Sequence, residues 1–412
     1  MANSFKLVLP SDRTERMHYI RRMFPQAKGR NLNEGWRGGR DQALRHLREV
    51  DPVAYSRNRN FINGAVTRLS PYLRHGCISL KEVTDDIQYR FGKQGQRLIA
   101  ELAYRDFWRQ NWYRRGNAIF SDLELPKVAL GENAMPMFIS QGITGLPCMD
   151  AVIRDLTMDG YVHNHARLWF AAYVIHWLKV DWRVAADWFE IQLIDGDKAS
   201  NHLSWQWVAS TFSAKPYFFN KENLARFTGE KYCATCQVNC PFDDSYENLQ
   251  KKIFTEPTKT TKKVYPVKMP EKGSFSQSTT VSVYIHDEML SSSNPLTKLA
   301  MPKYFIFDEA LYDEWPLKRI QFMADCLAEM SGVEVWLGDT REVLQTLGVG
   351  QVISQNTPAL QVKALLAPFN PIWQEEEKFT NVDVSLKRLE RFSRYWEKVL
   401  PDVLGVSTDN LN

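Results

Sequence analysis

The sequence lacks the features that mark membrane, secreted and nucleotide-phosphate-binding proteins. No apolar run approaches the length of a membrane-spanning helix, and residues 1–16 contain no secretory apolar core. We therefore expect a cytoplasmic protein with no membrane partner, whose six cysteines are not paired in disulfides. Neither GxGxxG nor GxxxxGKS/T occurs, so no motif indicates a nucleotide phosphate loop, and no internal repeat is visible.

Charge is distributed unevenly along a chain of ordinary globular composition. The 412 residues are 44% hydrophobic and 24% charged, enough for two or more domains with separate cores. Residues 1–60 carry thirteen Lys/Arg and six Asp/Glu, whereas residues 301–412 carry eleven and seventeen. A basic first part and an acidic last part suggest two domains, of which the first would meet a polyanion. A solvated helical face explains this charge equally well.

Helical spacing of apolar residues dominates the first part of the chain, and strand alternation is hard to find before Cys240. Residues 95–115 are the clearest case, an amphipathic helix expected to end at Gly116. Residues 255–300 are rich in Lys, Thr, Pro and Ser, so we expect an extended connector with little core.

The pattern changes again after Pro302. Short apolar runs at 304–307, 333–337 and 351–354 alternate with helical segments, which is typical of a small parallel α/β unit. The predicted domains are therefore a helical domain over 1–250, a connector over 251–300 and a small α/β domain with a C-terminal helix over 301–412.

Residues 160–211 combine dense aromatic side chains with polar groups. This stretch holds four of the eight histidines and six of the thirteen tryptophans. Asn164, Arg167 and Asp195 are interleaved with them, and such groups are costly to bury without partners. The mixture predicts a buried site for something large and flat with polar edges.

Four motifs occur in a fixed order: TRLSP at 67–71, ELAYRDF at 101–107, a segment from Gly145 to Asn164, and LIDGD at 193–197 continuing to WQW at 205–207. Together they resemble the flavin-binding helical domain of the photolyase/cryptochrome family. The resemblance covers roughly residues 35–220. It implies an all-helical domain that binds FAD and uses light to drive electron transfer from reduced flavin into a pyrimidine dimer in DNA.

The resemblance also implies residues for the flavin. Arg167 and Asp195 match an ion pair along the isoalloxazine ring, Asp197 a partner at its polar edge, and Asn201 the residue that faces N5. The segment from Thr67 to Ser70 matches the diphosphate and ribityl contacts, although a helix start with a capping hydroxyl explains it too. The full implied set of FAD contacts is Tyr55, Thr67, Arg68, Leu69, Ser70, Glu101, Arg105, Asn164, Arg167, Asp195, Asp197 and Asn201.

A lesion site is implied at neighbouring positions. Glu101 and Asn164 match residues that hydrogen-bond a flipped-out dimer, and Tyr104 and Trp207 match two aromatics that hold its bases. One of these aromatics is usually Trp, so Tyr104 is a departure. The (6-4) repair branch has histidines where this chain has Asn164 and Leu168, which favours a cyclobutane dimer as substrate.

Two tryptophans match the chain of tryptophans through which the family reduces its flavin. Trp205 corresponds to the inner member and Trp182 to the middle member. The outer member is expected between about residues 120 and 140, where this chain has no Trp. With Glu101, Asn164 and Trp207, these two residues form the predicted catalytic set.

The cysteines are similar to those of the iron–sulfur bacterial branch of the family. Cys148 precedes Cys233, Cys236 and Cys240, and four thiolates are what a 4Fe–4S cluster needs. A zinc site with the same four ligands is an alternative, and unligated thiols are another. Cys77 and Cys326 are expected to be free.

The family normally begins with an α/β antenna domain, which this chain lacks at its N-terminus. Residues 302–370 are similar in pattern to part of that domain, as a relocated, shortened version, and a generic α/β module fits nearly as well. No antenna chromophore or protein partner can be assigned from the sequence.

The function implied is FAD-dependent, light-driven repair of cyclobutane pyrimidine dimers, the activity of a deoxyribodipyrimidine photo-lyase, with UV-damaged DNA as partner. The basic segment 1–60 and the lysines between 259 and 272 would follow DNA phosphates. The alternatives are a blue-light receptor without repair, (6-4) photoproduct repair, and a non-catalytic flavoprotein that binds nucleic acid.

Overall fold

The computed structural model describes residues 4–255, 262–264, 269, 278–312 and 314–405. The chain divides into two compact units, each assembled from three stretches of sequence. Unit 1 comprises residues 1–50, 67–86 and 268–379, and unit 2 comprises residues 51–66, 87–267 and 380–412. The predicted domain boundaries at residues 250 and 300 stay predictions.

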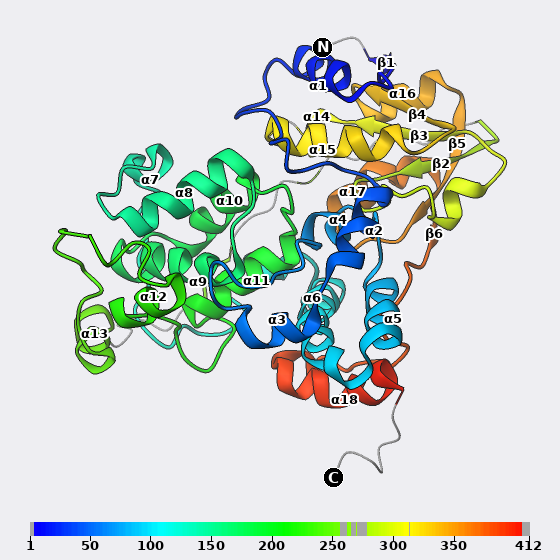
Figure 1. Ribbon diagram of the computed structural model, residues 1–412. Helices are drawn as coiled ribbons and strands as arrows, with labels where there is room; N and C mark the ends of the chain where they lie inside the picture. The colour runs from blue at the N-terminus through cyan, green and yellow to red at the C-terminus, as the bar shows by residue number, and fades with distance from the viewer. Residues whose placement is uncertain (1–3, 256–261, 265–268, 270–277, 313, 406–412) are drawn as a thin grey trace. The chain divides into compact units, whose positions relative to one another are not determined.

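Unit 1 is built on a six-stranded sheet with the order β1-β4-β3-β2-β5-β6 (Figure 1). Its strands are β1 (Phe5–Leu7), β2 (Thr280–Ile285), β3 (Lys303–Phe307), β4 (Val333–Leu337), β5 (Val349–Gln355) and β6 (Ile372–Gln374). All pairs are parallel except β1 with β4, which are antiparallel. The predicted parallel α/β fold class is therefore confirmed.

Three strands were not expected from the sequence. β2 lies within residues 255–300, where we expected a connector with little core, yet Val283, Tyr284 and Ile285 are fully buried. That expectation is wrong here because the Lys- and Ser-rich flank conceals a six-residue run rich in β-branched and aromatic residues. The other missed strands, β1 and β6, have only three residues each, too few to show alternation. Residues 256–261, 265–268 and 270–277 of this segment lie outside the described part of the chain.

Several helices belong to unit 1. They are α1 (Arg13–Met23), α2 (Arg40–Glu49), α4 (Ser70–Arg74), α14 (Glu309–Tyr312), α15 (Leu317–Ala328), α16 (Thr340–Thr346) and α17 (Leu360–Leu366). Every residue of α15 from Leu317 to Leu327 is buried, including Asp325. Arg16 of α1 donates to Asp325 at 2.9 Å and Arg13 at 3.1 Å, so a buried carboxylate on α15 is neutralised by its neighbouring helix.

Unit 2 is helical. It contains α3 (Pro52–Asn58), α6 (Gln96–Arg115), α7 (Met137–Gln141), α8 (Pro147–Asp159), α9 (Asn164–Ala172), α10 (Trp182–Gln192), α11 (Lys198–Ala209), α12 (Lys221–Thr228), α13 (Tyr246–Ile253) and α18 (Phe392–Leu404); α5 (Leu80–Phe91) crosses the boundary between the units. The predicted helix over 95–115 is confirmed as α6, which ends at Gly116 with φ 53°. A left-handed φ of this kind favours glycine and stops the helix.

Short helical turns connect these elements. The 3-10 turns span Gly92–Gly95, Gly116–Phe120, Pro295–Lys298, Ala367–Phe369 and Arg388–Glu390, and a π-helical turn spans Tyr173–Trp177 directly after α9. A π turn widens a helix locally and is often found at functional sites.

The core of unit 2 is the aromatic stretch seen in the sequence. Trp169, Phe170, Trp182, Phe189 and Trp205 belong to one buried cluster contributed mainly by α8 to α11. This packing holds α9, α10 and α11 in fixed positions, and these helices carry part of the candidate site. Within the described residues, no helix has both the length and the apolar character needed to cross a membrane.

Candidate functional site

Two arginine–carboxylate pairs meet at the turn Asp195-Gly196-Asp197. Nη2 of Arg167, on α9, lies 3.2 and 2.9 Å from the two carboxylate oxygens of Asp195. Nη2 of Arg105, on α6, lies 2.8 Å from Asp197. The Asp195 side chain is 2% exposed and that of Arg167 26% exposed, so the carboxylate is buried while part of the guanidinium is accessible. The predicted ion pair of Arg167 and Asp195 is thus present.

Local structure explains why these carboxylates are fixed. Asp197 is the N-cap of α11, and its side chain accepts a hydrogen bond from the Ser200 backbone N–H at 2.6 Å. A capping carboxylate also interacts favourably with the helix dipole. Arg167 is held from its other side, because its Nε donates to the Val162 carbonyl at 2.8 Å.

Asn201 lies one turn into α11, with its amide already oriented. Its Nδ2 donates to the Ala186 carbonyl at 2.9 Å, and its Oδ1 accepts from Trp205 Nε1 at 3.2 Å. A carboxamide has two N–H groups and two acceptor lone pairs, so further bonding capacity remains on both atoms. This residue can therefore both donate to and accept from a ligand.

Trp205 and Trp182, the two predicted electron carriers, are 4% and 1% exposed. Trp182 Nε1 donates to Asp122 at 2.8 Å, and Asp122 also accepts from Arg183 at 3.0 Å. The sequence analysis missed Asp122. Its position in a loop-like segment carried no signal, because only the fold brings it to α10.

The predicted lesion contacts Glu101 and Tyr104 both lie on α6. Glu101 is close to two arginines, Arg97 at 2.8 Å and Arg59 at 3.3 Å. Tyr104 is 38% exposed, and burial of the rest raises the pKa of its hydroxyl. Its ring stacks on Phe392 of α18, with centroids 3.4 Å apart and planes inclined by 11°. One face of Tyr104 is therefore already covered by the protein.

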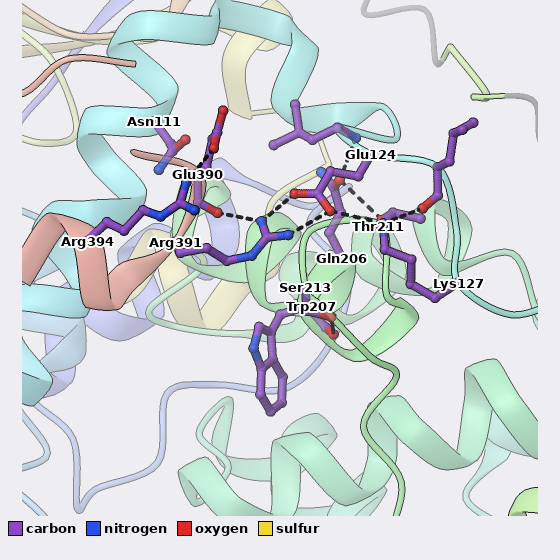
Figure 2. Close-up of polar contacts among 12 residues, drawn as sticks. Asn111, Glu124, Lys127, Gln206, Trp207, Thr211, Ser213, Glu390, Arg391 and Arg394 are labelled. Carbon is purple, nitrogen blue, oxygen red and sulfur yellow. Dashed lines mark hydrogen bonds and ion pairs between the residues drawn. The ribbon is translucent and has the colours of Figure 1, made fainter. Parts of the chain in front are cut away.

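Trp207, the second predicted aromatic, lies near the end of α11 and is 39% exposed. Its ring centroid is 5.5 Å from that of Tyr217. Ser213 fixes this end of the helix by donating to the Trp207 carbonyl at 2.8 Å. Figure 2 draws Trp207 together with a polar network in which Arg391 binds both Glu124 and the Glu390 carbonyl.

Phe392 and Arg391 were not among the predicted site residues. Both belong to the C-terminal segment, nearly 300 positions from α6 in sequence, and neither stands in a recognisable motif. The same segment contributes Tyr395, whose hydroxyl donates to Asp106 of α6. Only a long-range contact reveals that this segment lies next to Tyr104.

Asn164, Leu168 and His163 belong to the start of α9. Asn164 is the first helical residue and is exposed, and Leu168, one turn later, is half-buried. His163 is the N-cap and accepts a hydrogen bond from the His165 N–H at 3.2 Å. Burial lowers the pKa of His163 to about 4, so its imidazole is neutral near pH 7.

The remaining predicted FAD contacts are divided between the units. Tyr55 lies on α3 of unit 2, where burial raises the pKa of its hydroxyl. Thr67, Arg68, Leu69 and Ser70 belong to unit 1. Thr67 Oγ1 accepts from the Leu69 N–H at 3.3 Å, and Arg68 has a left-handed backbone with φ 52° and stacks over Trp36. A positive φ at a non-glycine residue is uncommon and is typical of functional segments.

Part of the positive charge of residues 1–60 is used inside unit 1. Arg13 and Arg16 bind Asp325, and Arg40 binds Glu82 at 2.5 Å. These three arginines form ion pairs inside unit 1, so their positive charge is not fully available to bind a polyanion. The prediction that the remaining basic residues follow DNA phosphates is unaffected.

The four predicted metal ligands line one pocket of unit 2. Cys148 at the start of α8 and Cys233, Cys236 and Cys240 after α12 all contribute to its wall, and Lys221 also lines it. Burial raises the pKa of Cys148 to about 12, and it also raises the pKa of Cys233 and Cys240. All six cysteines are free. Within the described part of the chain, no three His, Cys, Asp or Glu side chains are grouped closely enough to hold one metal ion.

Comparison with known proteins finds similarity over a large part of unit 2. Residues 98–269 match the family model described as the FAD binding domain of DNA photolyase. This region of the chain is therefore similar to the FAD-binding domain of DNA photolyase. Curated relatives include a deoxyribodipyrimidine photo-lyase of Streptomyces griseus, 36% identical over 44% of this chain and 41% of the relative. They also include a cryptochrome DASH of Danio rerio, 34% identical over 42% of this chain and 36% of the relative.

These matches are partial. The chain spans about two fifths of the length of these two curated relatives. Among solved structures, a cryptochrome of Synechocystis sp. PCC6803 is 24% identical over 53% of this chain and 56% of that one, with a TM-score of 0.45.

Proposed function

We propose that this protein is a light-driven, FAD-dependent enzyme that repairs cyclobutane pyrimidine dimers in DNA. The observation that carries the proposal is the pair of arginine–carboxylate contacts at Asp195-Gly196-Asp197, inside a matched FAD-binding domain. Relatives named photo-lyase, which match over about two fifths of this chain, support it.

The residues present suit a flavin. A flat aromatic ring system with polar edges needs an apolar cavity wall and a few fixed hydrogen-bonding groups. The aromatic cluster of unit 2 supplies the wall, and Arg167, Asp197 and Asn201 supply the groups. Reduced FAD, when bound, supplies the electron that light transfers to the dimer. Arg167 and Asp195 would orient the ring, and Asn201 would hydrogen-bond at N5.

The lesion would be held by residues on three helices. Extruding a damaged base from a duplex costs a few kcal/mol, which stacking on aromatic side chains offsets in part. Trp207 is exposed enough to provide such a surface, and Tyr104 offers the ring face that Phe392 does not cover. Glu101 and Asn164 would hydrogen-bond the base edges. Leu168 would contact the lesion where (6-4) enzymes use histidine.

The decisive assay compares dimer loss in light and darkness. Reduced protein is incubated with an oligonucleotide that contains one cyclobutane dimer, and the intact dimer is quantified with time. We expect loss only under blue or near-UV light, and only with flavin bound. Equal loss in light and darkness would contradict the proposal. A parallel oligonucleotide with a (6-4) photoproduct should remain unrepaired, because Asn164 and Leu168 replace the two histidines of that branch.

A blue-light receptor is the second candidate. Relatives named cryptochrome DASH also match this chain, and this observation favours it. A receptor would keep the flavin, show no dimer loss, and change its binding to a partner protein after illumination. The repair assay therefore distinguishes the two candidates directly.

We also propose that Trp205 and Trp182 carry electrons to the flavin. Both rings are buried in one aromatic cluster, and their indole N–H groups are satisfied by Asn201 and Asp122. For the outermost carrier and for an antenna chromophore we assign no residue.

We propose that the cysteine pocket holds a 4Fe–4S cluster. Four thiols from two segments of unit 2 line its wall, and four thiolates are the ligand set that such a cluster would need. The surroundings fit thiolate ligands poorly in the absence of metal, because burial favours the protonated thiol. Metal binding would displace these protons.

Replacing Cys148 with serine should remove iron and labile sulfide from the purified protein while FAD content stays within about twofold of wild type. The reason is that three thiolates hold such a cluster less well than four. Iron and sulfide assays with metal analysis give the result. Cys326→Ser, in unit 1, serves as the control, since Cys326 lies outside the pocket. If metal analysis of the wild-type protein found zinc and no iron, the pocket would hold a structural zinc site and the cluster proposal would be wrong.

A further inference from the structure

Two cysteines of unit 1 are in direct contact although they lie far apart in sequence. Cys77 belongs to the turn between α4 and α5, and Cys326 lies near the end of α15. Their sulfur atoms are 3.5 Å apart across 249 positions of sequence, and the two residues are 0% and 1% exposed. Neither lines the pocket formed by the other four cysteines. The pair is therefore a separate thiol site.

The backbone of Cys77 is fixed on both sides. Its N–H donates to the Tyr72 carbonyl at 2.9 Å. Its carbonyl oxygen accepts from Arg40 Nη1 at 3.2 Å and from Ser291 Oγ at 3.3 Å. Arg40 and Ser291 come from the first and the last of the three stretches that build unit 1. Cys77 is therefore held where these stretches meet, with little freedom to move away from α15.

The sulfur of Cys326 is held equally closely. Residues 317–327 of α15 are all buried, so the helix cannot shift without disrupting the core of unit 1. The Gly39 N–H donates to Cys326 Sγ at 3.1 Å. A Cβ on Gly38 would lie 2.8 Å from the same sulfur, so this close approach requires a residue without a side chain. The sulfur thus lies between this backbone and Cys77.

The two sulfurs are already close to the separation that a disulfide needs. An S–S bond is about 2.05 Å long, so the sulfurs must approach by roughly 1.5 Å, which rotation of two short, unbranched side chains supplies. We infer that Cys77 and Cys326 form an intramolecular disulfide under oxidising conditions. The bond joins residues 67–86 to residues 268–379, two stretches of unit 1 that most of unit 2 separates in sequence. Neither the bond nor its test depends on the proposed function.

Hydrogen peroxide is the oxidant that suits a buried pair, because it is small and uncharged and enters during local opening of the structure. It converts one thiol to a sulfenic acid and releases a water molecule. The sulfur of the second thiol then attacks the sulfenic sulfur, and the hydroxyl group leaves with the thiol proton as a second water molecule. Two electrons pass from the sulfurs to the peroxide. Burial raises the pKa of the Cys326 thiol, so little thiolate is present and the reaction is slow in the folded protein.

The disulfide should stabilise unit 1. It closes a loop between residues 249 positions apart, and a restriction of the unfolded chain over so long a loop favours the folded state. We expect the unfolding temperature to rise by about 5 °C or more after oxidation. Dithiothreitol should return it to the value of the reduced protein.

Peptide mapping of the full-length protein tests the bond itself. Accessible thiols of the reduced, folded protein are blocked with iodoacetamide, the protein is treated with hydrogen peroxide, and it is digested with trypsin without reduction. Cleavage after Lys or Arg places Cys77 in the peptide 75–81 and Cys326 in the peptide 320–341. We expect these two peptides to appear linked, lighter by two hydrogen atoms than their sum, and to separate on addition of dithiothreitol.

Cys77→Ala, treated with the same peroxide, is the matched control for the rise in unfolding temperature. Methionine oxidation affects both proteins alike, so only the wild type should become more stable. Absence of the linked peptide from folded, oxidised wild type would overturn the inference. So would a bond from Cys77 or Cys326 to any other cysteine, or the same rise in unfolding temperature in Cys77→Ala. If Cys77→Ala does not fold, the peptide map of the wild type decides alone.

Discussion

Replacing Asp195 with alanine should release FAD from the protein. Asp195 is a buried carboxylate whose two oxygens face Arg167, and removing one partner of a buried pair costs about 3–5 kcal/mol. The Arg167 side chain is 26% exposed and can regain some hydration, so we expect a cost at the lower end of this range, about 3 kcal/mol. That corresponds to roughly 150-fold weaker flavin binding if the loss falls on the ring contact. The ratio of flavin to protein absorbance after gel filtration, and an FAD titration of the apoprotein, measure it.

Two controls show whether the loss of FAD binding results from the change at the flavin site. Glu247→Ala breaks the exposed pair with Lys251, which is worth only about 0.3–0.5 kcal/mol, and should retain full flavin content. The thermal stability of the apoprotein separates flavin binding from folding. If Asp195→Ala retained wild-type FAD affinity, the placement of Arg167 and Asp195 along the ring would be wrong.

Much of the fold could be predicted because its elements are marked locally. The apolar spacing and terminal glycine of residues 95–116 give α6, and the apolar runs at 304–307 and 333–337 give β3 and β4. Strand β2 could not be predicted in the same way. It is short, and its neighbours in sequence have the composition of a linker, so only its pairing with β3 and β5 identifies it.

The distribution of charge along the sequence did not show which basic residues face solvent. The basic excess of residues 1–60 indicated a surface for a polyanion, yet Arg13 and Arg16 turn inward to Asp325 on α15. Asp325 is about 310 residues away in sequence, and no local pattern links the three. Net charge describes a long-range field, whereas pairing depends on the fold.

The candidate site was predictable where chemistry and motif agree. Arg167 and Asp195 stand in recognisable segments, and their ion pair is present. The partner of Asp197, Arg105, and the contact between Tyr104 and Phe392 required coordinates. A contact between α6 and the C-terminal segment cannot be predicted from the sequence of either segment alone.

Replacing Trp207 with alanine should weaken binding of dimer-containing DNA more than any other single aromatic substitution at the lesion site. Stacking of one base on an aromatic side chain is worth about 1–3 kcal/mol, or roughly 5- to 150-fold in affinity. Trp207 is 39% exposed at the end of a helix fixed by Ser213, so it offers a rigid surface. Affinity for dimer-containing and undamaged oligonucleotides of the same sequence, compared at one salt concentration, gives the result.

Tyr104→Ala should weaken the binding of dimer-containing DNA less than Trp207→Ala does. One face of Tyr104 already stacks on Phe392, so a base can gain only the other face, and the tyrosine ring is smaller than indole. Tyr89→Ala, which removes a 91% exposed tyrosine elsewhere in unit 2, should leave both affinities unchanged. An equal or larger loss for Tyr104→Ala would mean that Phe392 moves away when the dimer binds. In that case the variant Phe392→Ala should tighten binding, because the covered face of Tyr104 would then be open without displacing a protein side chain.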